Sequence, residues 1–385
     1  MRSYVFLLII VSLMLFSSCI KDEEMNQECD ILSAWVEGDD DFKALFYQPE
    51  TDMKIANVLS NDRHIIFTVR STETIKEVPV FFNITPGATI SPANGSKQDF
   101  SKGGVTYTVT SEDGRWHRSY VVDFCEPELP TSFNFENHEL TEVSNLFFGK
   151  YSYYSWYENN SKGVRVPTTW TNGNEGFGMG NSSATAENFP TSVDENGFEG
   201  HCVKMVTCDA GALAQALHKP LAAGNMFLGK FDMGQVLTNP LASTLMGIPM
   251  SYNEVPVRIT GYYKYKPGEK YIDQDLKEVQ GKVDEADIYS VIYRNKDEQG
   301  NPVMLNGGDV KTSPYVMLKA EVASLPPTDE WTPFEMVFSG QQLDESLLRD
   351  RGYNFTIVFS SSKDGASFLG AIGSTLYVDK VEVHF

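Results

Sequence analysis

The sequence VTYTVTSEDGRWHRSYVVDF, residues 105–124, carries the clearest structural signal in the chain. Apolar residues keep one phase on each side of its middle: Val105, Tyr107 and Val109, then Trp116, Tyr120, Val122 and Phe124. This alternation is typical of strands that bury one face. Asp113-Gly114 lies between the two runs and favours a tight turn, because glycine accepts positive φ. Residues 105–124 therefore predict a β-hairpin.

Further short strands are expected before this hairpin. HIIFTVR, residues 64–70, and VPVFF, residues 78–82, alternate in the same way. Several short strands within residues 30–125 predict a small β-sandwich of immunoglobulin type. Cys29 and Cys125 bracket this domain. We predict a disulfide between them if the first and last strands are neighbours, and the alternative is a pair of buried free thiols.

The second half of the chain is expected to form a separate, larger β domain. EPELPT, residues 126–131, is an acidic, proline-rich break and is the predicted linker. Beyond it, residues 132–385 contain about eight to ten strand-like stretches with long Gly- and Asn-rich loops, which favours a two-sheet jelly roll. YNFTIVF, residues 353–359, alternates most regularly. The predicted fold class is all-β: a small immunoglobulin-like sandwich followed by a jelly-roll sandwich resembling carbohydrate-binding modules.

The N-terminus predicts export. Residues 1–18 contain Arg2, an apolar run and small residues before Cys19, which is the layout of a secretory signal peptide. LFSSC, residues 15–19, resembles a bacterial lipobox, so we expect Cys19 to be lipidated; the alternative is a plain cleaved signal. The acidic run after Cys19 resembles a signal for export to the outer face of the outer membrane. Residues 19–29 also fit a solvated tether.

The charge balance limits the partners. The 385 residues contain 31 Lys and Arg against 52 Asp and Glu, a formal net charge of −21. Nucleic acid binding needs a basic patch that offsets the phosphate charge, so we expect no nucleic acid partner. Direct attachment to anionic lipid headgroups is excluded for the same reason. The predicted contact with the outer membrane is through the lipid on Cys19.

Five stretches of the C-terminal part together resemble a known family. They are AAGNMFLGKF (222–231), GIPMSYNEVPVRITGYYKYKPGEKY (247–271), DEADIYSVIYRN (284–295), DEWTPFEMVFSG (329–340) and residues 355–385. Their order resembles that of the putative carbohydrate metabolism domain of bacterial surface lipoproteins, over residues 132–385. The resemblance implies a jelly roll and a role in handling glycans at the cell surface. It implies no catalytic residues, although members of the family are often labelled putative glycoside hydrolases.

Aromatic residues cluster in two stretches that could bind sugar. YSYYSWYENN, residues 151–160, contains the candidates Tyr154, Trp156 and Tyr157, and Trp170 lies in VPTTWTNGNEGFGMGN, residues 166–181. Gly- and Asn-rich surroundings suggest loops, where binding residues concentrate. Exposed rings on such loops would form a binding surface. The alternative is that these rings fill the edge of the sandwich core.

The case for catalysis rests on one acidic stretch. Hydrolysis of a glycosidic bond uses two carboxylates roughly 5–9 Å apart. KVDEAD, residues 282–287, offers Asp284, Glu285 and Asp287 as weak candidates, and a solvated acidic loop explains them equally well. The motifs G-x-S-x-G and H-E-x-x-H are absent from the sequence. The enzyme question stays open, with a binding protein favoured over a glycoside hydrolase.

Asp379 raises a separate question. In YVDKVEVHF, residues 377–385, it keeps the phase of Tyr377, Val381 and Val383, so the alternation places a carboxylate on a buried face. Three explanations are open. A strand bulge could turn Asp379 outward, loop amides or hydroxyls could hydrogen-bond it, or it could share a structural calcium ion with Glu136. Local hydrogen bonds rank first, calcium second and a catalytic role for Asp379 third. No cofactor is required by the sequence.

These observations favour a lipid-anchored surface protein that binds a polysaccharide or oligosaccharide non-covalently. It would act in polysaccharide capture and utilisation, alongside other glycan-utilisation proteins. The alternatives are a glycoside hydrolase that acts through paired carboxylates and a structural or adhesin-type surface protein.

Overall fold

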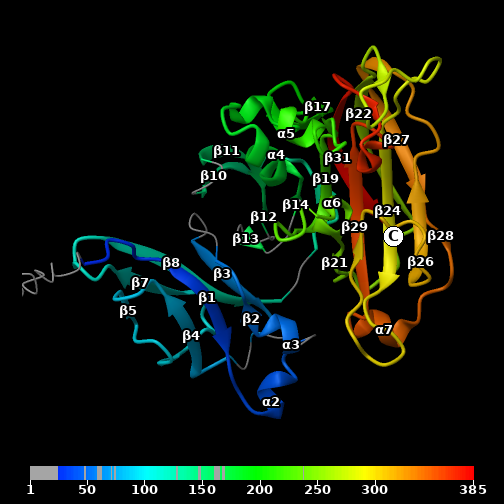
Figure 1. Cartoon of the computed structure of the whole chain (residues 1–385). Coiled ribbons are helices and arrows are strands. Elements are labelled where there is room, and N and C mark those ends of the chain that lie inside the picture. The colour runs from blue at the N-terminus through cyan, green and yellow to red at the C-terminus, as the bar shows by residue number, and fades with distance from the viewer. Residues whose placement is uncertain are drawn as a thin grey trace, which may run out of the picture. The chain divides into compact units, whose positions relative to one another are not determined.

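The computed structural model describes residues 25–385 except 47–48, 59–62, 71, 73–74, 127–128, 146–148, 160–164, 167–169 and 237 (Figure 1). The predicted signal peptide and Cys19 lie outside these residues. Two compact units are present, with the chain passing from one to the other between Phe124 and Cys125. Two short segments, 44–47 and 68–71, group with the second unit. In the part of the chain that is described, no helix has both the length and the apolar character needed to span a membrane.

The first unit is a sandwich of two four-stranded antiparallel sheets, counted over its described residues. One sheet has the order β2 (Lys54–Ile55), β1 (Ile31–Val36), β4 (Val78–Ile84), β6 (Lys97–Gln98). The other has the order β3 (His64–Thr68), β8 (His117–Cys125), β7 (Val105–Thr110), β5 (Thr89–Ser91). Two short helices, α2 (Asp40–Lys43) and α3 (Pro49–Asp52), follow β1. The predicted hairpin is β7–β8, in which Tyr107 pairs with Tyr120 and both are fully buried.

Of the two alternatives for Cys29 and Cys125, a disulfide or free thiols, the structure has thiols at both positions. Cys29 is a buried free thiol, and it precedes β1, whose first residue Ile31 donates its amide to the Tyr120 hydroxyl. Tyr120 lies five positions before Cys125 on β8. At ~3.3 Å per residue, that separation is about 16 Å along the strand, whereas a disulfide needs α-carbons within ~7 Å. The two cysteines are therefore too far apart along the domain to form a disulfide.

The second unit packs a larger sheet against a smaller one. The larger has the order β25 (Leu305–Asn306), β20 (Thr244–Met246), β19 (Asn225–Phe231), β29 (Tyr353–Ser360), β24 (Asp287–Arg294), β26 (Val316–Glu321), β28 (Ser339–Gly340), with β14 (Trp170–Thr171) on β19 and β21 (Ile248–Pro249) on β29. The smaller has the order β15 (Thr191–Asp194), β16 (Cys202–Val206), β31 (Thr375–His384), β22 (Arg258–Lys266), β27 (Thr328–Val337), with β9 (Ser132–Phe133) on β31.

Shorter elements extend this sandwich. Four two-stranded ribbons are described: β10 (His138–Asn145) with β11 (Gly149–Trp156), β12 (Glu158–Asn159) with β13 (Arg165–Val166), β17 (Cys208–Asp209) with β18 (Leu221–Ala222), and β23 (Tyr271–Ile272) with β30 (Gly370–Ala371). The helices are α4 (Asn174–Gly180), α5 (Ala212–Gln215), α6 (Pro240–Ser243), α7 (Glu345–Arg349) and the 3₁₀ turns η1 (Ala186–Asn188) and η2 (Gly365–Ser367). In Figure 1, α4 and α5 lie beside the β10–β11 ribbon.

The two sheets differ in how they are covered. Their inner faces form one apolar core, to which Ile259 and Val378 contribute from the smaller sheet and Ile288 and Phe355 from the larger. The larger sheet also buries its outer face, where a second cluster contains Phe227, Met246, Tyr289, Val291, Tyr293, Leu305, Val310 and Val358. The smaller sheet alternates buried and half-buried residues along β22. The predicted all-β class, with a small sandwich followed by a jelly-roll sandwich, is confirmed.

Candidate functional site

The two predicted sugar-binding tryptophans lie in the core and not on open loops. Trp156 and Trp170 are 4 % and 5 % exposed and belong to the core of the second unit. The Trp170 ring packs edge-on to Phe133 at 5.2 Å and stacks on Phe359 at 5.8 Å between centroids. Its Nε1 donates to Glu158 at 3.2 Å. The expectation of exposed tryptophans is therefore wrong, because β11 and β14 turn these side chains into the sandwich.

The two predicted tyrosines are half-buried and already have partners. The Tyr154 hydroxyl donates to Glu187 Oε1 at 3.3 Å, and the Arg165 guanidinium lies 4.4 Å from the centroid of the Tyr157 ring. As sugar-binding residues, Tyr154 and Tyr157 stay a prediction.

A different set of rings lies on the outer face of the smaller sheet. Along β22, Tyr263 and Tyr265 enter the core, whereas Tyr262 and Lys264 alternate with them and are half-buried. Tyr377 pairs with Lys264 from β31, and Trp331 comes from β27. Phe198 reaches this face from the loop between β15 and β16. We call these five residues the aromatic face: Phe198, Tyr262, Lys264, Trp331 and Tyr377.

The rings of the aromatic face contact one another closely. Phe198 stacks on Tyr262 with centroids 3.8 Å apart and planes 9° apart, and it meets Trp331 edge-on at 6.5 Å. Phe198 is still 40 % exposed. Lys264 Nζ lies 4.6 Å from the Trp331 ring and 4.8 Å from the Tyr377 ring, so cation–π contacts hold a donor among the rings. The face therefore combines fixed aromatic surface with a fixed hydrogen-bond donor.

Glu136 and Asp379 hold the loop that carries Phe198. Asp379 accepts hydrogen bonds from the amides of Glu199 at 3.1 Å and Lys380 at 2.7 Å. Glu136 accepts from the amide of His201 at 2.9 Å and contacts His201 Nδ1 at 2.7 Å. Gly200 has a φ of +64°, and a Cβ there would lie 2.1 Å from Glu136, so glycine permits the approach. The two carboxylates converge on one loop.

A bulge in β31 explains why Asp379 is buried without facing the core. Asp379 pairs with Tyr262 and Glu382 with Thr260, so one residue of β22 opposes two of β31. Lys380 takes a positive φ of 50° at this point. Asp379 therefore points to the outer face under the Phe198 loop, while Val381 points inward. The bulge and the loop amides together answer the question that the alternation raised.

The donor set around Glu136 and Asp379 does not fit a calcium ion. Calcium takes about six to eight oxygen ligands, but these carboxylates are directed at N–H groups. The Lys380 ammonium also pairs with Glu199 beside them. In the described part of the chain, no group of three or more His, Cys, Asp or Glu side chains is arranged to hold a metal ion.

Of the three acidic candidates, Asp284 has a structural role. It is 2 % exposed, and its Oδ2 accepts from the Ser362 hydroxyl at 2.5 Å, the Ala371 amide at 2.7 Å and the Ser374 hydroxyl at 2.7 Å. Burial raises the pKa of Asp284, and these donors oppose that rise. The Asp284 carboxylate therefore links the segments that contain Ser362, Ala371 and Ser374 by hydrogen bonds, and it is not directed at solvent. Glu285, by contrast, is exposed and lies 3.9 Å from Lys363 Nζ.

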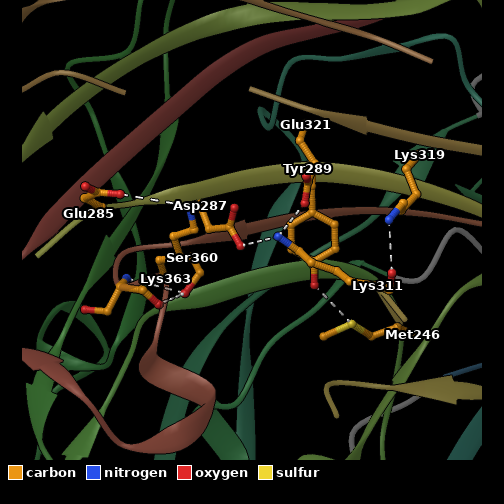
Figure 2. Close-up of polar contacts among 10 residues, drawn as sticks. Met246, Glu285, Asp287, Tyr289, Lys311, Lys319, Glu321, Ser360 and Lys363 are labelled. Carbon is orange, nitrogen blue, oxygen red and sulfur yellow. Dashed lines mark hydrogen bonds and ion pairs between the residues drawn. The ribbon is translucent and has the colours of Figure 1, made fainter. Parts of the chain in front are cut away.

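Asp287 belongs to a charged cluster on the outer side of the larger sheet. Figure 2 shows the Lys311 ammonium between two carboxylates, 2.8 Å from Asp287 and 2.7 Å from Glu321. The ammonium also lies 4.0 Å from the centroid of the Tyr289 ring. Burial raises the pKa of Asp287 while Lys311 opposes the rise, and the hydrogen bond from Lys311 lowers the pKa of Glu321. The two acids differ in environment, but one cation joins them.

Residues 134–384 match the family described as "Putative carbohydrate metabolism domain". The chain belongs to this family. Its first unit is also similar to a described domain, since residues 48–123 match "SGBP, N-terminal". Membership makes the second unit a carbohydrate-related domain, in agreement with the resemblance of residues 132–385.

The solved structures that are similar to this protein include two from Bacteroides species. One is described as a putative glycoside hydrolase from Bacteroides thetaiotaomicron VPI-5482; it is 35 % identical, with 95 % of this chain and 99 % of that chain covered and a TM-score of 0.73. The other is described as a putative glycoside hydrolase from Bacteroides vulgatus ATCC 8482; it is 36 % identical, with 66 % and 98 % covered and a TM-score of 0.59. No curated protein matches the chain.

Proposed function

We propose that this protein binds a glycan non-covalently on the aromatic face, as part of polysaccharide capture and utilisation. The observation that carries the proposal is the exposed Phe198 ring, stacked on Tyr262 beside Trp331 and Lys264. A sugar ring packs its CH face on an aromatic plane, and its hydroxyls need fixed polar partners. Membership of a carbohydrate-related family supports a glycan as that ligand.

The rigidity of the face supports affinity. Ordering a mobile side chain on binding costs about 0.5–1.5 kcal/mol. Phe198 is held by its ring contacts and by the loop that Asp379 and Glu136 anchor, so much of that ordering is complete before the ligand arrives. Lys264 is fixed between two rings in the same way.

A glycoside hydrolase is the second candidate function, because two similar solved structures are described as putative glycoside hydrolases. A glycosidase places its two carboxylates on either side of the scissile bond. Asp287 and Glu321 are close enough to share the Lys311 ammonium, but this cation takes up the position between them. Binding without cleavage is therefore the favoured function.

A glycan screen of the purified protein tests both candidates. Retention on an immobilised polysaccharide and release of reducing ends are measured together. We expect retention without release, weakened about tenfold or more by Phe198→Ala or Trp331→Ala, because buried aromatic contacts dominate binding free energies. Trp116→Ala is the matched control, since Trp116 is 57 % exposed and lies in the first unit.

Two outcomes would contradict the proposal. Release of reducing ends that is abolished by Asp287→Asn would make the protein an enzyme. Retention that is unchanged in both ring variants would remove the aromatic face as the binding site.

We also propose that Cys19 carries a lipid that anchors the protein in the outer membrane. The protein would face the cell exterior, where it would act alongside other glycan-utilisation proteins. The lipobox-like LFSSC and the acidic run after it support this location. Labelled palmitate should enter the protein in cells and should not enter the Cys19→Ala variant. Protease added to intact cells should digest the protein; full protection would contradict the exterior location.

A further inference from the structure

A cavity of about 270 Å³ lies in the second unit, between the outer face of the larger sheet and the short helices over it. The sheet contributes Met246, Tyr289 and Val358, and the covering segments contribute Phe177, Leu213 and Phe368. Ligand pockets occupy ~300–1,000 Å³, so the volume of this cavity lies just below that range and suits a small ligand. It is on the opposite sheet from the aromatic face.

The lining requires a ligand with an apolar body. Leu213 and Leu217, which line the cavity from α5 and the turn after it, are 60 % and 50 % exposed. Exposed leucines next to a buried apolar surface mark a binding surface. Apolar cavities exclude water and accept apolar molecules, because water finds no hydrogen-bond partners in them.

The charged residues of the lining favour an anionic head group. Within the described chain, these are Lys219, Asp287 and Lys363. Asp287 is already paired with Lys311 (Figure 2). Lys363 Nζ lies 3.9 Å from Glu285, and both side chains are more than half exposed, so this ion pair is weak. Two lysines at one cavity contrast with a chain whose net charge is −21.

We propose that this cavity binds a small amphipathic anion, whose apolar chain fills the cavity and whose carboxylate is held by Lys219 and Lys363. The site is separate from the aromatic face, so the same domain has sites for two classes of ligand.

A series of eight-carbon ligands tests the head group. Octanoate, octan-1-ol and octylammonium are titrated into the purified protein by calorimetry. Octanoate should bind about tenfold or more tightly than either of the others, because only it complements the two lysines. Equal affinity for the three ligands would overturn the proposal, and so would the absence of octanoate binding at millimolar concentration.

Variants test the position of the site. Lys363→Ala and Lys219→Ala should each weaken octanoate binding several-fold, whereas Lys270→Ala, a solvent-exposed lysine outside the cavity, should not. Ala214→Trp should abolish binding by filling the cavity from α5. Unchanged affinity in both cavity-lysine variants, or in a folded Ala214→Trp variant, would overturn the assignment. If Ala214→Trp does not fold, the lysine variants and the ligand series still decide. Phe198→Ala should bind octanoate like the wild type.

Discussion

A carboxylate inside a protein costs free energy unless hydrogen-bond donors surround it, and the residues of this chain show two ways of meeting that cost. Asp284 is surrounded by two serine hydroxyls and two backbone amides. Glu158 is also buried, and its carboxylate accepts a hydrogen bond from the Trp170 indole. The donors around Asp284 stabilise its ionised form. The hydrogen bond from Trp170 offsets only part of the cost of burying an ionised Glu158.

Replacing Asp284 should destabilise the second unit strongly. In Asp284→Ala, the hydroxyls of Ser362 and Ser374 and the Ala371 amide lose their common acceptor. Each hydrogen bond to a charged group contributes about 1.5–3 kcal/mol, so we expect a loss of about 3 kcal/mol in the free energy of unfolding, measured in urea. Exposed Glu285→Ala is the control and should change it by less than about 0.5 kcal/mol. Equal effects of the two variants would contradict a structural role for Asp284.

Glu158 should make stability depend on pH. Burial raises the pKa of Glu158 to about 7, although the Trp170 hydrogen bond opposes the rise. Because the folded pKa lies above the unfolded value of 4.5, this contribution to stability is complete below pH 4.5 and is lost as pH rises through 7. Glu158→Gln keeps the acceptor and removes the charge.

The Glu158→Gln variant should therefore gain stability relative to the wild type as pH rises from 4 to 8. We expect a gain of about 2–4 kcal/mol, since one pKa unit corresponds to about 1.4 kcal/mol. Urea unfolding of both proteins at a series of pH values measures the difference. A difference that does not change with pH would show that Glu158 is solvated in the folded protein.

At the scale of elements, local sequence patterns predicted which segments form strands but not which strands lie next to each other in the sheets. The two-residue alternation is a local property, so β7, β8, β22 and β29 could be recognised from sequence. The aromatic face joins Phe198, Tyr262, Trp331 and Tyr377 from four separate segments, and no local pattern specifies that they meet. The signal that was available is the GYYKY stretch, whose alternation leaves Tyr262 and Lys264 outside the core.

The misplaced tryptophans have a related cause. Asn- and Gly-rich surroundings favour loops, but Trp156 ends β11 and Trp170 begins β14, and tertiary packing buries both. The phase of β31 was also misread up to Asp379: Tyr377 and Asp379 lie on the outer face, whereas Val381 and Val383 enter the core, because a single extra residue in a strand reverses the side-chain phase at the bulge. The position of a bulge depends on how a strand pairs with its neighbour, which the local sequence does not specify. The bulge in β31 could therefore be given only as one of three explanations for Asp379.

The loop between β15 and β16 should depend on Asp379. Asp379→Asn keeps the size of the side chain but cannot accept from both the Glu199 and Lys380 amides with its two terminal atoms. We expect a loss of about 1–3 kcal/mol in the free energy of unfolding. Glycan affinity should also fall several-fold, because Phe198 is adjacent to Glu199. Phe198 fluorescence is too weak to follow, so retention on the glycan is the readout; unchanged retention in a destabilised variant would separate the loop from binding.

At the scale of the whole molecule, the main apolar core and the candidate sites belong to the second unit. The main apolar cluster runs from Leu129 to Val383, and the aromatic face and the cavity are built from residues 173–377. The first unit has its own pair of sheets and its own buried rings, such as Phe67 on Phe124. Neither the aromatic face nor the described lining of the cavity contains a residue of the first unit, so both sites should bind their ligands without it.

A fragment of residues 126–385 should fold and bind without the first unit. A domain that encloses its own hydrophobic core unfolds cooperatively on its own, so calorimetry should show one transition for the fragment. Its glycan retention should equal that of the whole protein within about twofold, and Phe198→Ala should weaken both alike. The full chain carrying Trp116→Ala is the matched control for an effect of the first unit. A folded fragment that no longer retains the glycan would contradict the aromatic face as a sufficient site and would assign part of the binding surface to residues before 126.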